Sequence, residues 1–240
     1  MNAVLLRQEA ADGVLLLTLN RPESRNAISL ELTDVLIEAF AEFRNSSRWR
    51  AAVITGTPPA FCAGLDIKSF SSPDAPRHRV TEMITAIPAL GKPVIAAVNG
   101  AAITGGLEIV LSCDFAIAGT QAHFADTHVR IGALSGSGMG ARLPRRVGAA
   151  WARQMILTGE PVQAETALRI GLVNELVDQD CVVSRAVELA AMIAGHDSEL
   201  VMLAKGVVDR GVAATLHEAI TIEQQVLAER KAKGAMQWRA

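Results

Sequence analysis

Two adjacent glycines and one carboxylate, Gly105, Gly106 and Glu108, interrupt an apolar run of the chain, AVNGAAITGGLEIVLSCDF at residues 97–115. An ionised carboxylate in apolar surroundings loses its hydration, which is costly unless another group compensates for it. A segment that served only as a core helix would have no use for two glycines just before such a charge. Chemistry is therefore to be sought here first.

The helix predicted at 104–112 combines, in its first turn, two kinds of group that proton transfer needs. The first N–H groups of a helix lack internal partners and lie at the positive end of its dipole. Gly105 has no Cβ, so a ligand oxygen can approach its N–H closely, and Glu108 follows one turn later. A hydrogen-bond donor for a developing oxyanion beside a carboxylate base suits proton transfer next to a carbonyl group. The residues alone leave open a simpler alternative, in which the glycines allow close packing and Glu108 complements the helix dipole.

The composition is that of one globular domain of ordinary to large size. Of 240 residues, 50% are hydrophobic and 20% are charged, a balance that supports a hydrophobic core and argues against disorder. The net charge of −2 provides no basic face for nucleic acid, and six Phe, three Trp and no Tyr leave little for base stacking. We expect no nucleic-acid partner.

The three cysteines, Cys62, Cys113 and Cys181, are far apart and lack any CxxC spacing. This pattern favours a reducing compartment and argues against a disulfide framework or a zinc site. The N-terminal segment has no signal-peptide pattern. Residues 93–119 are apolar, but glycine pairs and Glu108 leave no uninterrupted stretch of about 20 apolar residues. We therefore expect a soluble, cytoplasmic protein that does not enter a membrane.

Nearly continuous apolar strands separated by helices predict a parallel α/β sheet that is covered on both faces. The strands are expected at 14–19 (VLLLTL), 51–56 (AAVITG), 92–100 (KPVIAAVNG) and 114–119 (DFAIAG). The helices are expected after a Ser29 N-cap, along the face formed by Val80, Met83, Ile84 and Ile87, and at 104–112. The segment SSPDAPRHR at 71–79 is typical of a loop. From about residue 149 the pattern turns helical, ending in a charged amphipathic helix at 218–234.

Five segments follow one another along the chain: NRPESRNAIS, ITGTPPAFCAGLDIKSF, KPVIAAVNGAAITGGLEIVLSCDFAIA, FADTHVRIGALSGSGMGARLPRRVG and LTGEPVQAETALRIGLVNELV. In this order they resemble the crotonase, or enoyl-CoA hydratase/isomerase, family over residues 13–180. The resemblance implies an α/β fold with a crotonase-like core of ββα spiral turns at 1–195 and a helical C-terminal trimerisation region at 196–240. It also implies an acyl-CoA thioester substrate and a homotrimer or dimer of trimers. No metal or redox cofactor is expected, because coenzyme A arrives as part of the substrate.

The resemblance assigns roles to particular positions of this sequence. The backbone N–H groups of Leu65 and Gly105 match the two donors of the family's oxyanion hole. Binding of the CoA thioester is expected from the early loop, the segment AGLDIK and the start of the helix at 104–112, at Arg25, Ala27, Ala63, Leu65, Asp66, Ile67, Lys68 and Gly105. From the residues themselves, Arg25 and Lys68 are equally compatible with pairing to CoA phosphates and with being solvated surface charges.

Glu108 matches the first of the two catalytic glutamates in the hydratases, whereas His128 stands at the position of the second. Ser135-Gly136 replaces the family's usual Pro-Gly. His128 has three readings: it replaces the missing acid, it fills the position while Glu108 both takes and returns the proton, or it marks a different reaction. Because an imidazole titrates near neutral pH, the first reading is chemically sound. We favour the second, in which weak hydratase activity depends mainly on Glu108.

The sequence thus predicts an enoyl-CoA hydratase, a lyase that adds water to a trans-2-enoyl-CoA. The alternatives are another crotonase reaction, such as isomerisation, thioester hydrolysis or decarboxylation, and an acyl-CoA-binding paralogue without turnover. Three further patterns are set aside. GSGMG at 136–140 lacks the spacing of a dinucleotide loop; His123, Asp126 and His128 lack a metal-ligand spacing; and Cys62 is taken as a small buried thiol.

Overall fold

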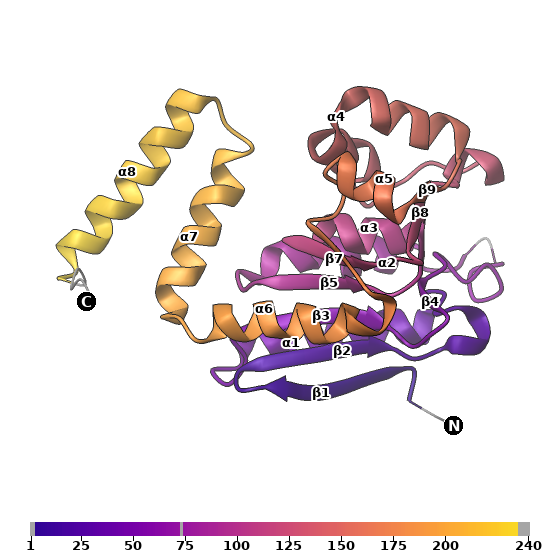
Figure 1. Ribbon diagram of the computed structural model, residues 1–240, viewed down its shortest axis with the longest axis horizontal. Coiled ribbons are helices and arrows are strands. Elements are labelled where there is room, and N and C mark those ends of the chain that lie inside the picture. Colours follow the sequence, from indigo (N-terminus) through magenta and orange to yellow (C-terminus); the bar gives the residue numbers. More distant parts are fainter. Residues whose placement is uncertain (1–2, 73, 235–240) are drawn as a thin grey trace. The chain divides into compact units, whose positions relative to one another are not determined.

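The computed structural model of the chain describes residues 3–72 and 74–234. The chain divides into two units between Ala194 and Gly195 (Figure 1). Among the described residues, the first unit holds both β-sheets and six α-helices, and the second holds a pair of helices.

The larger sheet of the first unit has the strand order β1-β2-β3-β5-β7-β10. Only the β1–β2 hairpin is antiparallel, and every other neighbouring pair is parallel. The strands are β1 (Leu5–Ala11), β2 (Val14–Leu19), β3 (Ala51–Gly56), β5 (Val94–Val98), β7 (Phe115–Gly119) and β10 (Glu175–Val177). The four strands predicted as apolar runs are confirmed as β2, β3, β5 and β7.

A second, four-stranded sheet is built from very short strands in the order β4-β6-β8-β9. They are β4 (Ala60–Cys62), β6 (Ala101–Ile103), β8 (His123–Ala125) and β9 (Val162–Gln163). The first three follow β3, β5 and β7 in the chain, so each turn of the chain adds one strand to each sheet before the next helical segment. This repeat is the ββα spiral that the sequence resemblance implied, and the predicted α/β fold class is confirmed.

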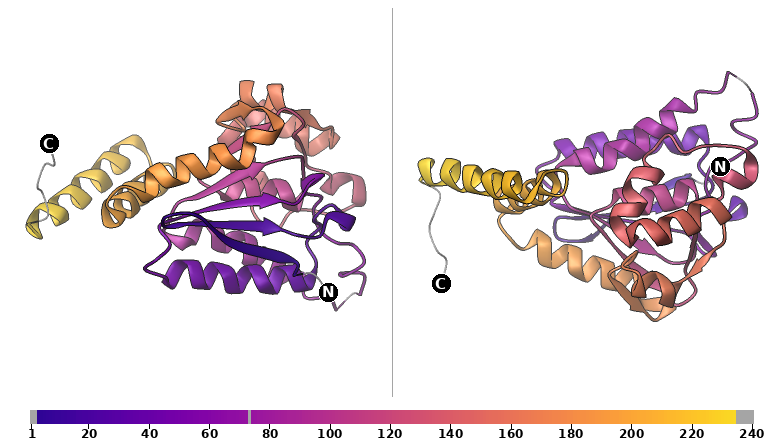
Figure 2. Two further views of the ribbon diagram at one scale, coloured as in Figure 1. Left: turned by 60° about the horizontal axis from the view of Figure 1, so that its bottom comes forward. Right: turned by 90° about the horizontal axis from the view of Figure 1, so that it is seen from above.

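Helices cover both faces of the six-stranded sheet. Alternate residues of β2 separate the two cores: Leu15 and Leu17 belong to the cluster with α1, and Val14 and Leu16 to the cluster with α6. Figure 2 (left) shows α1 and α6 on opposite sides of the sheet. The helices are α1 (Leu30–Asn45), α2 (His78–Ala86), α3 (Gly105–Ser112), α4 (Met139–Thr158), α5 (Ala164–Arg169) and α6 (Val182–Ala194), with 3-10 turns η1 (Pro22–Ser24), η2 (Ile87–Leu90), η3 (His128–Ile131) and η4 (Gln179–Cys181).

The predicted helix signals are confirmed at three places and corrected at one. Ser29 caps α1, accepting a hydrogen bond from the Leu32 N–H at 3.1 Å, and the predicted faces of α2 and α3 are buried. The helical region expected from about residue 149 begins earlier, because α4 starts at Met139. Gly148, at φ 79°, interrupts the regular helix within α4. The apolar periodicity therefore does not continue through the whole helix, and residues 139–148 were not predicted as helical.

The second unit consists of α7 (Ser198–Gly211) and α8 (Leu216–Ala232), which pack on each other. Asp197 caps α7, and Thr215 with Glu218 forms a capping box at the start of α8. No residue of either helix is buried. Within the described residues of the chain, no helix is both long and apolar enough to cross a bilayer.

Helix α3 carries Glu108, and its position is fixed by a close backbone contact at Gly106. A Cβ on Gly106 would lie 2.2 Å from the carbonyl oxygen of Cys62 and 2.9 Å from its Cβ. A Cβ on Gly105 would lie 3.0 Å from the end of the Ile28 side chain and at an ordinary contact distance of 3.6 Å from the Gly64 backbone. The two glycines therefore differ in purpose, and only Gly106 is required by the packing of α3 on β4.

This difference gives a paired prediction. Gly106→Ala forces the backbone of α3 away from β4, so we expect the free energy of unfolding to fall by about 2 kcal/mol or more. Gly105→Ala requires only a shift of the Ile28 side chain, and we expect a change within about 1 kcal/mol. Urea unfolding of the two variants measures both. Equal losses of stability would contradict the assigned packing.

Candidate active site

The turn at Gly64 and Leu65 lies directly against the start of α3. Leu65 forms a parallel bridge with Ile28, in which the Ile28 N–H donates to the Gly64 carbonyl at 2.7 Å and the Asp66 N–H donates to the Ile28 carbonyl at 2.9 Å. A Cβ on Gly64 would lie 3.6 Å from the nitrogen of Gly105. Within the described residues, neither the Leu65 N–H nor the Gly105 N–H has a hydrogen-bond partner. Two unpaired backbone donors in a packed interior form a natural site for an oxygen ligand.

Thr104, immediately before these donors, has a strained backbone. Its φ of 52° and ψ of −104° are rare for a residue with a Cβ, and such conformations persist only where neighbouring contacts hold them. The Thr104 N–H donates to the Ala125 carbonyl at 2.7 Å, and its hydroxyl lies 2.6 Å from that of Thr127. The Thr127 N–H also donates to the Thr104 hydroxyl, at 3.1 Å. These contacts fix both the first N–H of α3 and the segment that follows β8.

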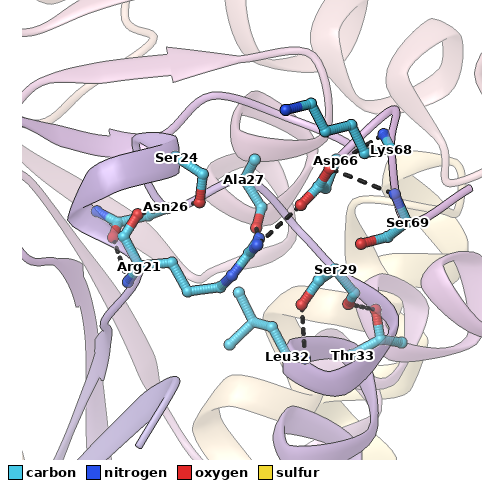
Figure 3. Close-up of polar contacts among 10 residues, drawn as sticks. All are labelled: Arg21, Ser24, Asn26, Ala27, Ser29, Leu32, Thr33, Asp66, Lys68 and Ser69. Atoms are coloured by element: carbon cyan, nitrogen blue, oxygen red, sulfur yellow. Dashed lines mark hydrogen bonds and ion pairs between the residues drawn. The ribbon is translucent and has the colours of Figure 1, made fainter. Parts of the chain in front are cut away.

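An internal ion pair anchors the Gly64–Asp66 turn to the early loop (Figure 3). Arg21 donates to the Asp66 carboxylate at 2.8 Å and to the Ala27 carbonyl at 2.5 Å. The other Asp66 oxygen accepts the N–H groups of Lys68 and Ser69, at 3.1 and 3.4 Å. Burial alone raises the pKa of Asp66, but the Arg21 hydrogen bond and the two N–H groups outweigh it and hold this pKa below its usual range. The carboxylate is thus engaged inside the protein.

The structure brings together the residues that the resemblance assigned to coenzyme A. The Ala63 N–H donates to the carbonyl of Arg25 at 3.0 Å, so the early loop and the AGLDIK turn run side by side. Ala27 is buried, whereas the side chains of Arg25, Ile67 and Lys68 are exposed. Asp66 differs from the others because its side chain is occupied by Arg21. The sequence argument gave no role to Arg21, although it lies in the segment NRPESRNAIS that carried part of the resemblance.

Glu108 is buried, with 5% of its surface exposed. The Ser135 hydroxyl donates to its carboxylate and itself accepts the N–H groups of Ser137 and Met139, at 3.3 and 3.2 Å. Burial is the largest influence on the pKa of Glu108 and raises it. The Ser135 hydrogen bond, the His128 charge and the Ser137 N–H lower it in part. Glu108 is therefore a stronger base than an exposed glutamate.

His128 is held by Asp126, two residues earlier. Its Nδ1 lies 2.6 Å from Asp126 Oδ1, and the same oxygen accepts the His128 backbone N–H at 3.1 Å. This hydrogen bond is the largest influence on the pKa of His128 and raises it, with support from the charges of Asp126 and Glu108, while burial opposes them. The site therefore contains a buried carboxylate and an imidazole that favours its charged form.

Arg142 is a further member of the site that the sequence argument missed. Its guanidinium donates to the Ser112 hydroxyl, which in turn donates to the Glu108 carbonyl at 2.8 Å, and its charge interacts with the Glu108 carboxylate. Arg142 comes from the part of α4 that was not predicted as helical. No local pattern in the sequence marked it.

Comparisons with known proteins agree on one family. The family model described as enoyl-CoA hydratase/isomerase matches residues 9–238. The chain is 34% identical over 235 residues to the short-chain-enoyl-CoA hydratase of Clostridium acetobutylicum, covering 95% of this chain and 89% of that protein.

Two solved structures illustrate the range of similar proteins. An enoyl-CoA hydratase from Bacillus anthracis gives a TM-score of 0.90 at 32% identity, over 94% of this chain and 90% of that one. A monofunctional enoyl-CoA isomerase from M. smegmatis gives 0.81 at 32% identity, over 91% of this chain and 99% of that one. Proteins of this fold thus include hydratases and an isomerase.

The contact between Ser135 and Glu108 leads to a prediction about charge. Ser135→Ala removes a hydrogen bond that favours the ionised carboxylate, so we expect the pKa of Glu108 to rise above its value in the unmodified protein. Ser137→Ala is the matched control, because it keeps both the Ser135 hydroxyl and the Ser137 N–H. Carbon-13 NMR of glutamate-labelled protein, with Glu108→Gln to assign the signal, measures the shift. An unchanged Glu108 titration in Ser135→Ala would contradict the role given to this hydrogen bond.

Proposed function

Since the chain belongs to the enoyl-CoA hydratase/isomerase family of acyl-CoA enzymes, we propose that it hydrates the C2–C3 double bond of a trans-2-enoyl-CoA. The observation that carries this proposal is the placement of Glu108. A buried carboxylate with a raised pKa stands one helical turn after Gly105, whose N–H is unpaired within the described residues. This is the pairing of base and oxyanion donor that addition to a conjugated thioester requires.

The two backbone N–H groups receive the thioester oxygen. As water adds to C3, electrons move through the double bond and the thioester oxygen becomes an enolate oxygen. The N–H groups of Leu65 and Gly105 stabilise that charge, and losing one such donor typically slows a reaction by about 10²–10³-fold. Because both donors belong to the backbone, side-chain changes at Leu65 are expected to be mild.

Glu108 is the base that activates water. Its carboxylate takes one proton from water while the water oxygen bonds to C3, and a proton delivered to C2 completes the product. The Ser135 hydroxyl donates to this carboxylate and is itself held by the N–H groups of Ser137 and Met139, which keeps the carboxylate in a fixed orientation. The charge of His128 acts on Glu108 and lowers its pKa in part.

The coenzyme A moiety is proposed to bind along Arg25–Ala27 and the AGLDIK turn, Ala63–Lys68. The exposed cations Arg25 and Lys68 suit its phosphates, because an arginine fork or a lysine ammonium pairs well with phosphate oxygens. Asp66 contributes by holding the turn through Arg21. The apolar side chain of Ile67, which is 70% exposed, is available to the pantetheine arm.

A product screen over short- and medium-chain trans-2-enoyl-CoAs in ¹⁸O-labelled water tests the reaction class. Hydration yields a thioester heavier by one labelled water. Unchanged mass with a moved double bond would indicate an isomerase, and free coenzyme A would indicate a hydrolase. Binding without consumption of any thioester would indicate a paralogue without turnover.

If Glu108 is the base, Glu108→Gln keeps the shape of the site and removes its proton acceptor. We expect the turnover number to fall by about 10²–10⁴-fold, with little change in thioester affinity. Glu175→Gln is the control, because this carboxylate pairs with Arg185 at β10 and takes no part in the site. Turnover of Glu108→Gln close to that of the unmodified protein would return Glu108 to a structural role at the helix N-terminus.

We propose the cytoplasm as the compartment, on the chemistry of the cysteines. Cys62, Cys113 and Cys181, all within the described part of the chain, are not joined by a disulfide. Cys62 and Cys113 are buried, and burial raises the pKa of the Cys62 thiol to about 12. Thiols of this kind suit a reducing environment.

We also propose that the helical unit at 195–240 associates with other copies of the chain, as a homotrimer or a dimer of trimers. A pair of helices without a buried residue has too little interior to cover its own apolar side chains. The exposed set comprises Leu200, Met202, Val208, Val212, Leu216, Ile220 and Leu227. Light scattering at micromolar protein should give the mass of three or six chains. A stable monomer would contradict the proposal.

A further inference from the structure

We infer that Asp126 is a positioning residue that holds His128 as the proton donor of this site, so that the acid facing Glu108 is an imidazolium supported by a buried carboxylate. The chemical use of the pair rests on the proposed hydration. The pair itself belongs to the free protein and is testable without substrate.

The geometry of the pair is that of an oriented imidazole. Asp126 is 2% exposed and lies at the end of β8, while the side chain of His128 is 14% exposed. Asp126 Oδ1 receives both the ring Nδ1–H, at 2.6 Å, and the backbone N–H of His128, at 3.1 Å. Two contacts on one oxygen fix the ring relative to its own backbone, and a carboxylate on Nδ1 leaves Nε2 to exchange protons.

The rest of the segment is equally fixed. Thr127, between the two residues, is bound to the Thr104 hydroxyl through its N–H and its own hydroxyl. The carboxylate and imidazole are thereby tied to the start of α3, where Gly105 and Glu108 lie. Among the described residues, His128 Nε2 has no hydrogen-bond partner, so its proton is available to a substrate atom.

The charges around His128 favour its protonated form. Asp126, from its own segment, and Glu108, from α3, are both negative and act on the ring. From α4, which packs against η3, Arg142 acts on Glu108 and donates to Ser112, not to the ring. Arg130, two residues after His128 in η3, is paired with Glu160 at 2.8 Å. The pKa of His128 therefore stays above its ordinary value despite burial.

The proton balance of hydration is satisfied by the two groups together. Glu108 takes a proton from water as the oxygen bonds to C3, and the imidazolium gives its Nε2 proton to C2 as the enolate collapses to the thioester. The product has gained one hydroxyl and one hydrogen. Glu108 is then protonated and His128 neutral with its Nδ1–H still on Asp126, and one proton lost to solvent and one gained from it restore both.

This assignment differs from the reading that the sequence alone favoured, in which His128 only fills the position. The distinguishing contact is the one to Asp126. Burying a carboxylate costs free energy unless it is paired. An imidazole that only occupied the position would give no reason to bury Asp126 against its Nδ1. The structure therefore favours the interpretation in which His128 replaces the missing acid, with Asp126 as the residue that orients its ring and stabilises its charge.

The test is the titration of His128 by NMR in the free protein, with Asp126→Asn as the variant and Glu175→Gln as the control. Asparagine keeps the shape and an acceptor oxygen for Nδ1–H but removes the charge, so the His128 pKa should fall. His128→Gln assigns its signal among the five histidines. In the unmodified protein the pKa of His128 should exceed its ordinary value, a measurement that decides the matter even if Asp126→Asn fails to fold.

The rate measurement uses the same variants. With hydration as the assay, the alkaline fall of kcat should move to lower pH in Asp126→Asn and stay in place in Glu175→Gln, with a loss of about tenfold or more at pH 8. Asp126→Glu, which restores the charge, should recover part of the alkaline limb.

The outcomes separate the two claims. A His128 pKa at or below its ordinary value, or an alkaline limb that does not move in Asp126→Asn, overturns the inference even where hydration is found. A raised His128 pKa that falls in Asp126→Asn supports the pair. If the same protein then hydrates no enoyl thioester, the pair stands as a property of the site and the proposed function fails.

Discussion

The close contact between the backbone of α3 and that of β4 is the constraint on which the site depends. Only glycine fits at position 106, where an added Cβ would meet the Cys62 carbonyl at 2.2 Å. This contact places the first N–H of α3 beside the Gly64–Leu65 turn. Glu108, in the first turn of α3, is thereby brought to the same site as the two N–H groups. Thr104, with its strained backbone, fixes the start of α3, and the Arg21–Asp66 ion pair fixes the turn at Gly64–Asp66.

The electrostatics of the site follow from its burial. Glu108 and Asp126 are carboxylates with 5% and 2% of their surface exposed, and ionised groups at such depth require partners. Glu108 finds a partner in the Ser135 hydroxyl, and Asp126 finds partners in the ring and backbone of His128. Burial biases Glu108 toward accepting a proton, whereas the hydrogen bond to Asp126 biases His128 toward carrying one.

The sequence predicted what its local patterns encode. The apolar runs of β2, β3, β5 and β7 were visible, whereas β1, with its polar and exposed Arg7, Gln8 and Glu9, carried no such signal. Strands of two or three residues, such as β4 and β8, are too short to show a period. Gly105 and Glu108 could be singled out from their own segment, but Leu65 and His128 came only from family resemblance.

The contacts that tune the site were beyond sequence reasoning, because they join distant positions. Ser135 reaches Glu108 across 27 residues, and Arg21 reaches Asp66 across 45. The packing of the two sheets and α3 determines which side chains meet at such separations, and the spacing of residues in the sequence does not reveal these contacts. Asp126 is the exception. It stands two residues from His128, yet its role is visible only once both are seen at the end of a buried strand.

The central claim is that the Leu65 and Gly105 N–H groups, brought together by this packing, receive the thioester oxygen. The most direct test is a crystal structure of the Glu108→Gln protein with trans-2-butenoyl-CoA bound. The account predicts the thioester oxygen within about 2.7–3.2 Å of both nitrogens, with C3 facing residue 108. A thioester oxygen bonded to other groups, with the Gly105 N–H left without a partner, would contradict it.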